Sequence, residues 1–356
     1  MCDGVTRLTL SSVSSLRRNI GGPCTVLKIH NGRVFAGSQE GILACWIVDS
    51  GEEVWKVAIS GPLSDIDFSG GKVHVSGSSN IYCLDYNSGE IVWSRELEGS
   101  SDYVLSNDAG IWATSSVYEI GIGDYTESTI WRFDDSGELQ QRWTIAERCW
   151  FFGTDGRGLV LGLGRPRCGT LRVGEDHLEH LEISGAGPVT CGTNAGNRIL
   201  LGHSDGNVSE IGGGSALRGA SPVSAVLGVE NETIAGFEDG DVVSKAGWIH
   251  SSTGSVAALS LGPSPSGNRA IWVCLDRGVV ILDSEGGAPL LELDHGCRIS
   301  ESDSEGDIIV LGDSEGEIHL MERDVLSRRL EDDLATTEDD SMKRLMMDRL
   351  RGLRRG

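Results

Sequence analysis

The chain has 356 residues, including 50 glycines and only eight prolines, and carries 53 acidic against 30 basic side chains. A formal net charge of −23 disfavours a protein whose main body binds nucleic acid or anionic lipid. It fits the acidic proteome of a salt-adapted or marine organism, the favoured interpretation, or a dedicated cation-binding surface. No apolar run approaches the roughly 18 residues of a transmembrane segment, and the N-terminus lacks the apolar core of a secretory signal. We therefore expect a cytoplasmic protein whose nine cysteines, without a CxxC pair, are mostly small buried side chains.

The first predicted element is the alternating segment VTRLTLSSV, residues 5–13. Alternation of apolar and polar residues is typical of a β-strand with one buried face. The segment has no hairpin partner beside it in the sequence, so we expect it to pair with a distant part of the chain.

A strand–turn–strand motif then recurs along the chain, as in VFAGSQEGILACW from Val34. Each copy has an apolar run, usually a glycine, two or three small or acidic residues, a second glycine and a second strand-like run. Asp-Gly and Glu-Gly pairs tolerate the positive φ angles of a tight hairpin turn. The predicted structural turn glycines are Gly37, Gly41, Gly202, Gly206, Gly236, Gly240, Gly312 and Gly316.

The spacing of the copies predicts the fold. Seven intervals cover the 275 residues from Gly37 to Gly312, about 39 residues per unit, which is the length of a four-stranded propeller blade. The third unit lengthens an inner turn with YEIGIGDYTE, residues 118–127. We predict an all-β fold, a β-propeller of eight four-stranded blades; seven blades is the alternative, because the weaker central units could merge.

The last unit indicates how the ring closes. It supplies three strands, CRISES, DIIVLG and EIHLMER, before a helical pattern begins at Asp324. A propeller domain of residues 1–323, in which residues 5–13 complete the last blade, would leave no open sheet edge. Residues 324–356 are predicted to be a separate helical tail.

Three segments resemble a known repeat: IVDSGEEVWKVAI, YCLDYNSGEIVWSREL and FDDSGELQQRWTI. They resemble the repeat of the pyrroloquinoline-quinone enzyme type, while GHSDGNVSEI and GDSEGEIHLME are similar to WD repeats. The first resemblance implies an eight-bladed propeller, and its enzymes imply a bound quinone, a calcium ion, a catalytic Asp and often a disulfide of adjacent cysteines. This chain has no adjacent cysteine pair, and function does not follow from the propeller fold itself.

Candidate chemistry is sparse. The pair His177 and His180 has metal-ligand spacing for a helix but lies in a predicted outer strand, where the two side chains point to opposite faces. Acidic turns at 303–307 and 313–317 offer oxygens for calcium but are interpreted as solvated hairpin turns, and His203 as a variable turn residue. Arg165 and Arg167 could hold an anion, although an exposed loop is the favoured interpretation. We predict no catalytic residue, no cofactor and no metal site.

The tail differs from the ring in charge. Leu326, Leu330 and Leu334 have helical spacing, and residues 341–356 contain six basic residues and one acidic residue. An amphipathic helix there could bind a protein partner, contact an anionic membrane or nucleic acid, or be a frayed terminus attracted to the acidic ring. The predicted partner-binding residues are Met342, Lys343, Arg344, Leu345, Met346, Arg349, Leu350, Arg351, Leu353, Arg354 and Arg355.

The function predicted from these patterns is a non-enzymatic β-propeller scaffold for protein–protein interaction, with the tail as tether or partner-binding arm. The alternative is a small-ligand-binding protein or quinoprotein-like enzyme that uses the central channel. An enzyme should bring polar or titratable groups from several blades to one mouth of the channel, whereas a scaffold should show scattered groups.

Overall fold

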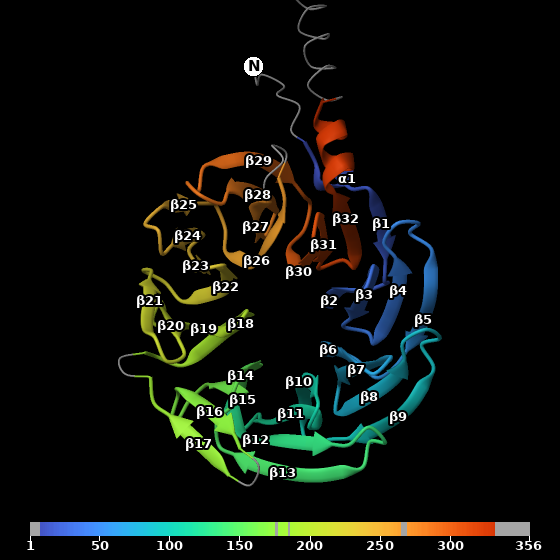
Figure 1. The fold of residues 1–356 in the computed structure, drawn as a ribbon, viewed down its shortest axis with the longest axis vertical. Helices are drawn as coiled ribbons and strands as arrows, with labels where there is room; N and C mark the ends of the chain where they lie inside the picture. Colours follow the sequence, from blue (N-terminus) through green and yellow to red (C-terminus); the bar gives the residue numbers. More distant parts are fainter. Residues whose placement is uncertain (1–7, 175–176, 184–185, 265–268, 332–356) are drawn as a thin grey trace, which may run out of the picture.

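The computed structural model describes residues 8–174, 177–183, 186–264 and 269–331. In this part of the chain the strands form eight four-stranded antiparallel sheets, arranged as blades around a central opening (Figure 1). The prediction of eight blades is confirmed, and the seven-bladed alternative is wrong. Every hairpin used for the count, from Gly37 to Gly312, contributes the second strand of a separate blade.

The first four blades follow the chain, with the first strand of each innermost. They are blade 1, β2 (Cys24–His30), β3 (Arg33–Ser38), β4 (Ile42–Ile47) and β5 (Glu53–Ala58); blade 2, β6 (Leu63–Ser69), β7 (Lys72–Gly77), β8 (Asn80–Asp85) and β9 (Ile91–Glu96); blade 3, β10 (Ser100–Asn107), β11 (Gly110–Glu119), β12 (Asp124–Phe133) and β13 (Leu139–Ile145); and blade 4, β14 (Cys149–Asp155), β15 (Gly158–Leu163), β16 (Thr170–Val173) and β17 (Leu178–Leu181).

The last four blades have shorter outer strands, and the eighth draws on both ends of the chain. They are blade 5, β18 (Val189–Ala195), β19 (Arg198–His203), β20 (Asn207–Glu210) and β21 (Gly214–Arg218); blade 6, β22 (Val223–Val229), β23 (Glu232–Phe237), β24 (Asp241–Ser244) and β25 (Ile249–Ser251); blade 7, β26 (Val256–Pro263), β27 (Arg269–Leu275), β28 (Gly278–Asp283) and β29 (Pro289–Asp294); and blade 8, β30 (Ile299–Glu305), β31 (Ile308–Asp313), β32 (Glu317–Glu322) and β1 (Leu16–Asn19).

The core lies between the blades. Second strands such as β3 and β19 are almost continuously buried because neighbouring blades cover both of their faces. One apolar cluster, for example, joins Phe35 and Leu43 of blade 1 to Val73 and Leu84 of blade 2. Burial of this kind repeats around the ring and holds each blade against the next.

The two glycines of each hairpin have different roles. The second glycine of each pair adopts the left-handed conformation that the turn requires, with φ between 81° and 93° at Gly41, Gly206, Gly240 and Gly316. The first glycine lies in the second strand, and a Cβ on Gly37 would come within 2.5 Å of Val26 Cγ1. The prediction of a turn role is therefore wrong for Gly37, Gly202, Gly236 and Gly312, which permit close packing of the blades.

Hydroxyl groups at the second position of the inner strands link neighbouring blades. The hydroxyl of Ser64 donates to the carbonyl of Ser101 at 2.7 Å, and that of Thr190 donates to the carbonyl of Val223 at 2.7 Å. The same contact crosses the closing junction, where Ser300 donates to the carbonyl of Cys24 at 2.8 Å. Blade 8 therefore meets blade 1 through the same inner contact that joins blades inside the ring.

The closing strand is not the predicted one. β1, Leu16–Asn19, pairs antiparallel with β32, whereas Leu10–Val13 forms the short helix α1 and residues 5–7 lie outside the described residues. The side chains and backbones of Thr9 and Ser12 form a reciprocal capping box that starts α1. The capping box therefore favours a helix where the alternating pattern predicted a strand. An N-terminal strand does close the ring, but it is Leu16–Asn19, so the prediction that residues 5–13 complete the last blade is wrong.

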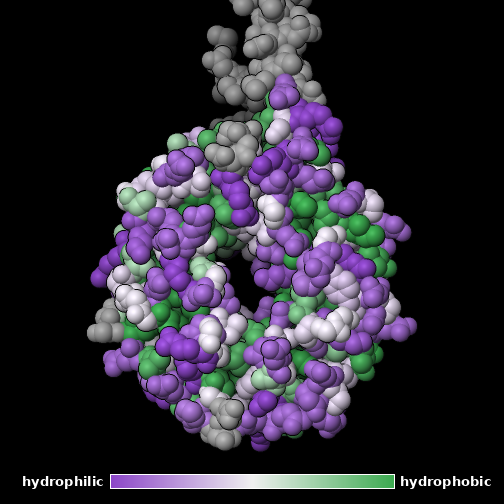
Figure 2. Space-filling model, in the orientation of Figure 1, coloured by the Kyte–Doolittle hydropathy of each residue, from purple (hydrophilic) through white to green (hydrophobic). Residues whose placement is uncertain are grey.

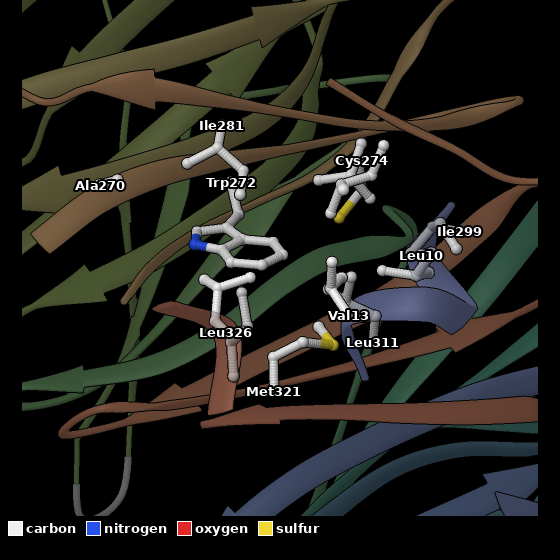
Figure 3. Close-up of a cluster of buried hydrophobic side chains, with 13 residues drawn as sticks. Leu10, Val13, Ala270, Trp272, Cys274, Ile281, Ile299, Leu311, Met321 and Leu326 are labelled. Carbon is white, nitrogen blue, oxygen red and sulfur yellow. The ribbon is translucent and has the colours of Figure 1, made fainter. Parts of the chain in front are cut away.

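Both ends of the described chain pack on the outer side of blades 7 and 8. Leu10 and Val13 of α1 lie in one buried cluster with Trp272, Met321 and Leu326 (Figure 3). Leu326 belongs to a helix at residues 323–331 that follows β32 directly and begins one residue before the helical pattern expected from Asp324. The tail beyond residue 331, with all of its predicted partner-binding residues, lies outside the described residues.

Candidate functional site

Charged residues line one sector of the central channel. They come from the inner strands of three consecutive blades: Glu301 and Asp303 of β30, Lys28 of β2, and Asp65 and Asp67 of β6. The channel is visible as the opening at the centre of the ring in Figure 2. The inner strands of blades 5, 6 and 7 contain no charged residue, whereas those of blades 3 and 4 add Asp102 and Asp155.

Three of the four carboxylates accept hydrogen bonds from backbone amides of the next blade. Asp303 Oδ2 accepts the amide hydrogen of Ile29 at 2.7 Å, Asp65 Oδ2 accepts that of Val104 at 3.0 Å, and Asp67 accepts that of Ser106. The innermost strand of a blade otherwise leaves such amides unpaired, which is costly in a confined space. These carboxylates therefore stabilise the ring in a way that the sequence patterns did not reveal.

Glu301 differs from the other channel carboxylates. Its side chain makes no hydrogen bond within the described residues. Burial raises its pKa to about 8, although Lys28 opposes the shift. Burial also opposes the charge on Lys28, but Asp303, Asp65 and the other acids outweigh it and raise the lysine pKa. A single positive charge, that of Lys28, therefore interacts with four negatively charged or acidic side chains.

The longest hairpin of the ring projects from blade 3. β11 and β12 have ten residues each, and the turn between them carries Ile120, 89% exposed, and Ile122, 67% exposed. Tyr118, at the end of β11, is 51% exposed. Exposed apolar side chains this close together are unusual on a soluble surface and typical of an interaction site.

An aromatic and arginine stack supports the base of this hairpin. Tyr118 packs edge-on against Tyr125, with ring centroids 5.1 Å apart, and Tyr125 against Trp150 at 6.4 Å. The guanidinium carbon of Arg148 lies 3.9 Å from the ring centroid of Tyr125 and 4.2 Å from that of Trp150. Asp102 pairs with Arg148 at 3.1 Å. The stack ties the hairpin to the inner strand of blade 4.

Other residues singled out in the sequence have structural partners. Arg167 forms a bidentate ion pair with the buried Glu147, with both contacts at 2.7 Å. Arg165 is exposed. His180 lies in the predicted outer strand and bonds the carbonyl of Cys168 at 2.8 Å. The interpretation of His203 as a variable turn residue is wrong: it is fully buried and bonded to Gly187 and Ser209.

A cluster of metal-ligand side chains lies in blade 8. One ligand atom each from His295, Asp313 and His319 lies within 4.8 Å of the others. The Cys297 sulfur lies 3.3 Å from His295 Nε2 and 3.2 Å from Asp313 Oδ2. Asp313 is 1% exposed, so the interpretation of its turn as solvated is wrong for this residue. Burial opposes its ionisation, but hydrogen bonds from His295, Cys297 and the backbone outweigh burial and lower its pKa to about 2.

The comparisons with known proteins agree with this architecture. The sequence profile of the outer membrane protein assembly factor BamB matches residues 9–95. A comparison of the sequence with curated proteins found no match. Within the described residues, no helix combines the length and apolar character needed to cross a membrane.

Three solved structures share the fold at low sequence identity. Saccharomyces cerevisiae Sqt1 is 11% identical with a TM-score of 0.67, covering 87% of this chain and 98% of its own. BamB from Moraxella catarrhalis is 16% identical with a TM-score of 0.62, covering 86% and 97%. The WD40 β-propeller domain of Doa1 is 14% identical with a TM-score of 0.54, covering 86% and 95%. The resemblance to PQQ-like and WD-like propeller repeats is confirmed.

Proposed function

We propose that the chain is a non-enzymatic scaffold for protein–protein interaction, and that its main contact site is the blade 3 hairpin at residues 118–125. The observation that carries the proposal is the exposure of Ile120 and Ile122 at the tip of this hairpin. Tyr, Trp and Arg, the residue types enriched at interfaces, lie directly beneath them in the stack of Tyr118, Tyr125, Arg148 and Trp150. A propeller fold with neighbours such as a WD40 domain is consistent with this role.

The chemistry of the hairpin indicates the kind of partner. Glu119 and Asp124 are exposed on either side of the two isoleucines, and the whole chain carries a net charge of −23. Charge complementarity therefore favours a protein segment with apolar residues flanked by basic ones. The basic tail, with residues 341–356, would add a second contact whose contribution depends on its reach.

The channel sector supports the alternative less well. Titratable groups from three blades do converge there, which is the arrangement expected of a ligand site. Asp65, Asp67 and Asp303 nevertheless accept backbone hydrogen bonds, so their oxygens already have a structural role. We therefore propose no reaction in the channel.

A paired affinity experiment tests the proposal. The full chain is compared as bait with the double variant Ile120→Glu/Ile122→Glu and with the control Ile249→Glu, which alters an isoleucine that is 64% exposed on blade 6. Each buried isoleucine contributes roughly 1.5–3 kcal/mol to an apolar contact, so the double variant should lose at least about tenfold in recovered partner. The control should recover the same partner as the unaltered chain.

Equal recovery by the double variant and the unaltered chain would contradict the hairpin as the contact site. A further bait that ends at Glu331 separates the hairpin from the tail. If this bait loses the partner while the double variant keeps it, the tail carries the interaction and the proposed site is wrong. Circular dichroism of each bait confirms that the ring is folded.

A further inference from the structure

We propose that the cluster in blade 8 is a metal site, in which His295, Cys297, Asp313 and His319 bind a zinc ion. Two imidazole nitrogens, a sulfur and a carboxylate oxygen form a donor set that Zn²⁺ accepts in a tetrahedral arrangement. The four residues come from the loop before β30, from the end of β31 and from β32.

His295, Asp313 and His319 already lie close enough together to share one ion, and Cys297 lies beside two of them. Ligand atoms around a tetrahedral zinc lie about 3.3–3.8 Å apart, given bond lengths of about 2.0–2.3 Å. In the structure His295 Nε2 is 2.8 Å from Asp313 Oδ2, and the Cys297 sulfur is 3.2 Å from the same oxygen. The atoms of His295, Asp313 and His319 all lie within 4.8 Å of one another. Cys297 lies outside this group of three, so its side chain would have to move toward His319 for all four ligands to share one ion.

His319 supplies an independent indication. Its side chain is fully buried, and its Nε2 atom makes no hydrogen bond within the described residues. A buried polar nitrogen without a partner is rare and calls for a ligand, because its desolvation is otherwise uncompensated. The nearest charged group is the carboxylate of Glu317, 3.5 Å from Nε2, which is not aligned for a hydrogen bond.

Ser14 lies against one ring nitrogen of His319. Its hydroxyl oxygen is 2.7 Å from the carbonyl of Leu10 and 3.0 Å from Nδ1 of His319. When the hydroxyl donates its one hydrogen to Leu10, it accepts from Nδ1, and this nitrogen then carries the proton. Nε2 is then left with a bare lone pair, as in a metal-binding histidine held by an outer hydrogen bond.

Asp313 is oriented in the same manner. Its Oδ1 atom accepts the amide hydrogens of Glu315 and Glu317 at 2.9 and 2.8 Å, which leaves Oδ2 facing the cluster. In the metal-free form Oδ2 accepts the Nε2 hydrogen of His295. On binding, His295 carries its proton on Nδ1 instead, and the Cys297 thiol releases its proton to solvent. One proton therefore leaves for each zinc ion bound.

The position of the cluster indicates what the ion would do. It would join the blade 7 to blade 8 connection to β31 and β32, and Ser14 connects it to the N-terminal segment that supplies β1. The ring closes at this place, so zinc would stabilise the closure itself. The inference is independent of the proposed interaction site, which lies on blade 3.

The test uses the tag-free full chain, stripped with a chelator and titrated with Zn²⁺ and separately with Co²⁺. We expect one ion per chain, a rise in melting temperature of at least about 3 °C with Zn²⁺, and the intense visible bands of tetrahedral Co²⁺ with a thiolate charge-transfer band. Mg²⁺ and Ca²⁺, which prefer oxygen ligands, should give no shift. Absence of stoichiometric Zn²⁺ and Co²⁺ binding by the folded unaltered chain would overturn the proposal.

Three variants locate the ion. His319→Gln should lose at least about tenfold in affinity, the expected cost of losing a ligand. Cys297→Ser should lose the charge-transfer band, and this half-buried position tolerates the change should His319→Gln not fold. His203→Gln is the matched control, because His203 is equally buried and both of its ring nitrogens bond neighbours, Gly187 and Ser209. Undiminished binding by the Cys297 and His319 variants, or loss in the control, would contradict the assignment.

Discussion

Blades 2 and 8 have the same strand order but obtain their outer strands differently. In blade 2 the chain runs without interruption from Leu63 to Glu96, and a tight turn joins β8 to β9. In blade 8 the outer strand is β1, four residues that arrive from the other end of the chain and pair with β32. A turn keeps β9 beside its partner through local chain connection, whereas β1 depends on contacts made elsewhere.

Those contacts come from both termini. Leu10 and Val13 are buried in the cluster shared by blades 7 and 8. Arg329, in the helix at residues 323–331, donates to the carbonyl of Ser12 at 3.0 Å and also to that of Ser14. Closure of this ring therefore depends on packing of the terminal segments. A substitution in these segments can weaken the closure while leaving the residues of the β1–β32 pair unchanged.

The largest expected effect comes from the apolar cluster that holds α1, the helix just before β1 in the sequence. Leu10→Ala empties a fully buried site in α1, Leu84→Ala empties one in blade 2, and each should lower the free energy of unfolding by about 2–5 kcal/mol. Only Leu10→Ala should speed amide hydrogen exchange in Leu16–Asn19, because only Leu10 holds the closing segment. Equal exchange in the two variants would show that closure is no weaker than the rest of the ring.

A smaller effect is expected in the channel, where Glu301 and Asp65 are each the third residue of their inner strand. Asp65 accepts amide hydrogens from Ile66 and Val104, whereas Glu301 accepts none within the described residues. Burial raises the pKa of Glu301 from 4.5 to about 8, so its contribution to stability is complete at low pH and is lost as the pH rises through this interval.

Glu301→Gln removes this titration and should stabilise the ring by about 1–3 kcal/mol at pH 8.5, a figure reduced for water in the channel. The difference should vanish near pH 4, as measured by urea unfolding across this pH range. Glu305→Gln, which alters an exposed glutamate of the same strand, is the control and should have little effect at either pH. A destabilised Glu301→Gln variant at pH 8.5 would be inconsistent with an uncompensated charge.

The smallest effect is expected at the C-terminal helix. Arg329→Ala removes the hydrogen bonds to the carbonyls of Ser12 and Ser14 and should cost about 1 kcal/mol. Arg328→Ala, at an exposed neighbouring position, should change the free energy of unfolding by less than about 0.5 kcal/mol. Thermal unfolding should show a lower melting temperature for Arg329→Ala than for Arg328→Ala. Equal melting temperatures would show that the hydrogen bonds of Arg329 do not stabilise the closed ring.

The repeat architecture could be predicted because its signals are local. The second glycine of each hairpin, such as Gly41, and the apolar runs beside it encode a turn within a few residues. The position of the closing strand could not be predicted in this way. Leu16–Asn19 has the sequence LRRN, too short and polar to stand out, while residues 5–13 alternate convincingly and yet include the capping box of α1.

The candidate sites depend on distances that the sequence does not express. His295, Asp313 and His319 are up to 24 residues apart, and only the folding of blade 8 brings them together. The blade 3 hairpin left a clearer signal, since YEIGIGDYTE places two isoleucines among glycines and acids, where a turn has no core to bury them. The length of this turn could be predicted from the sequence, but its exposed apolar surface was not predicted.

Photo-crosslinking from the hairpin tip tests the central claim most directly. A photoreactive phenylalanine analogue replaces Ile120 in the full chain, and a second protein carries it at Ile249, which is also exposed but lies on blade 6. If the hairpin is the interaction site, we predict a discrete crosslinked protein partner from position 120 and none from position 249. Crosslinks from both positions alike, or none from position 120 under conditions in which the partner is recovered, would contradict the hairpin as the interaction site.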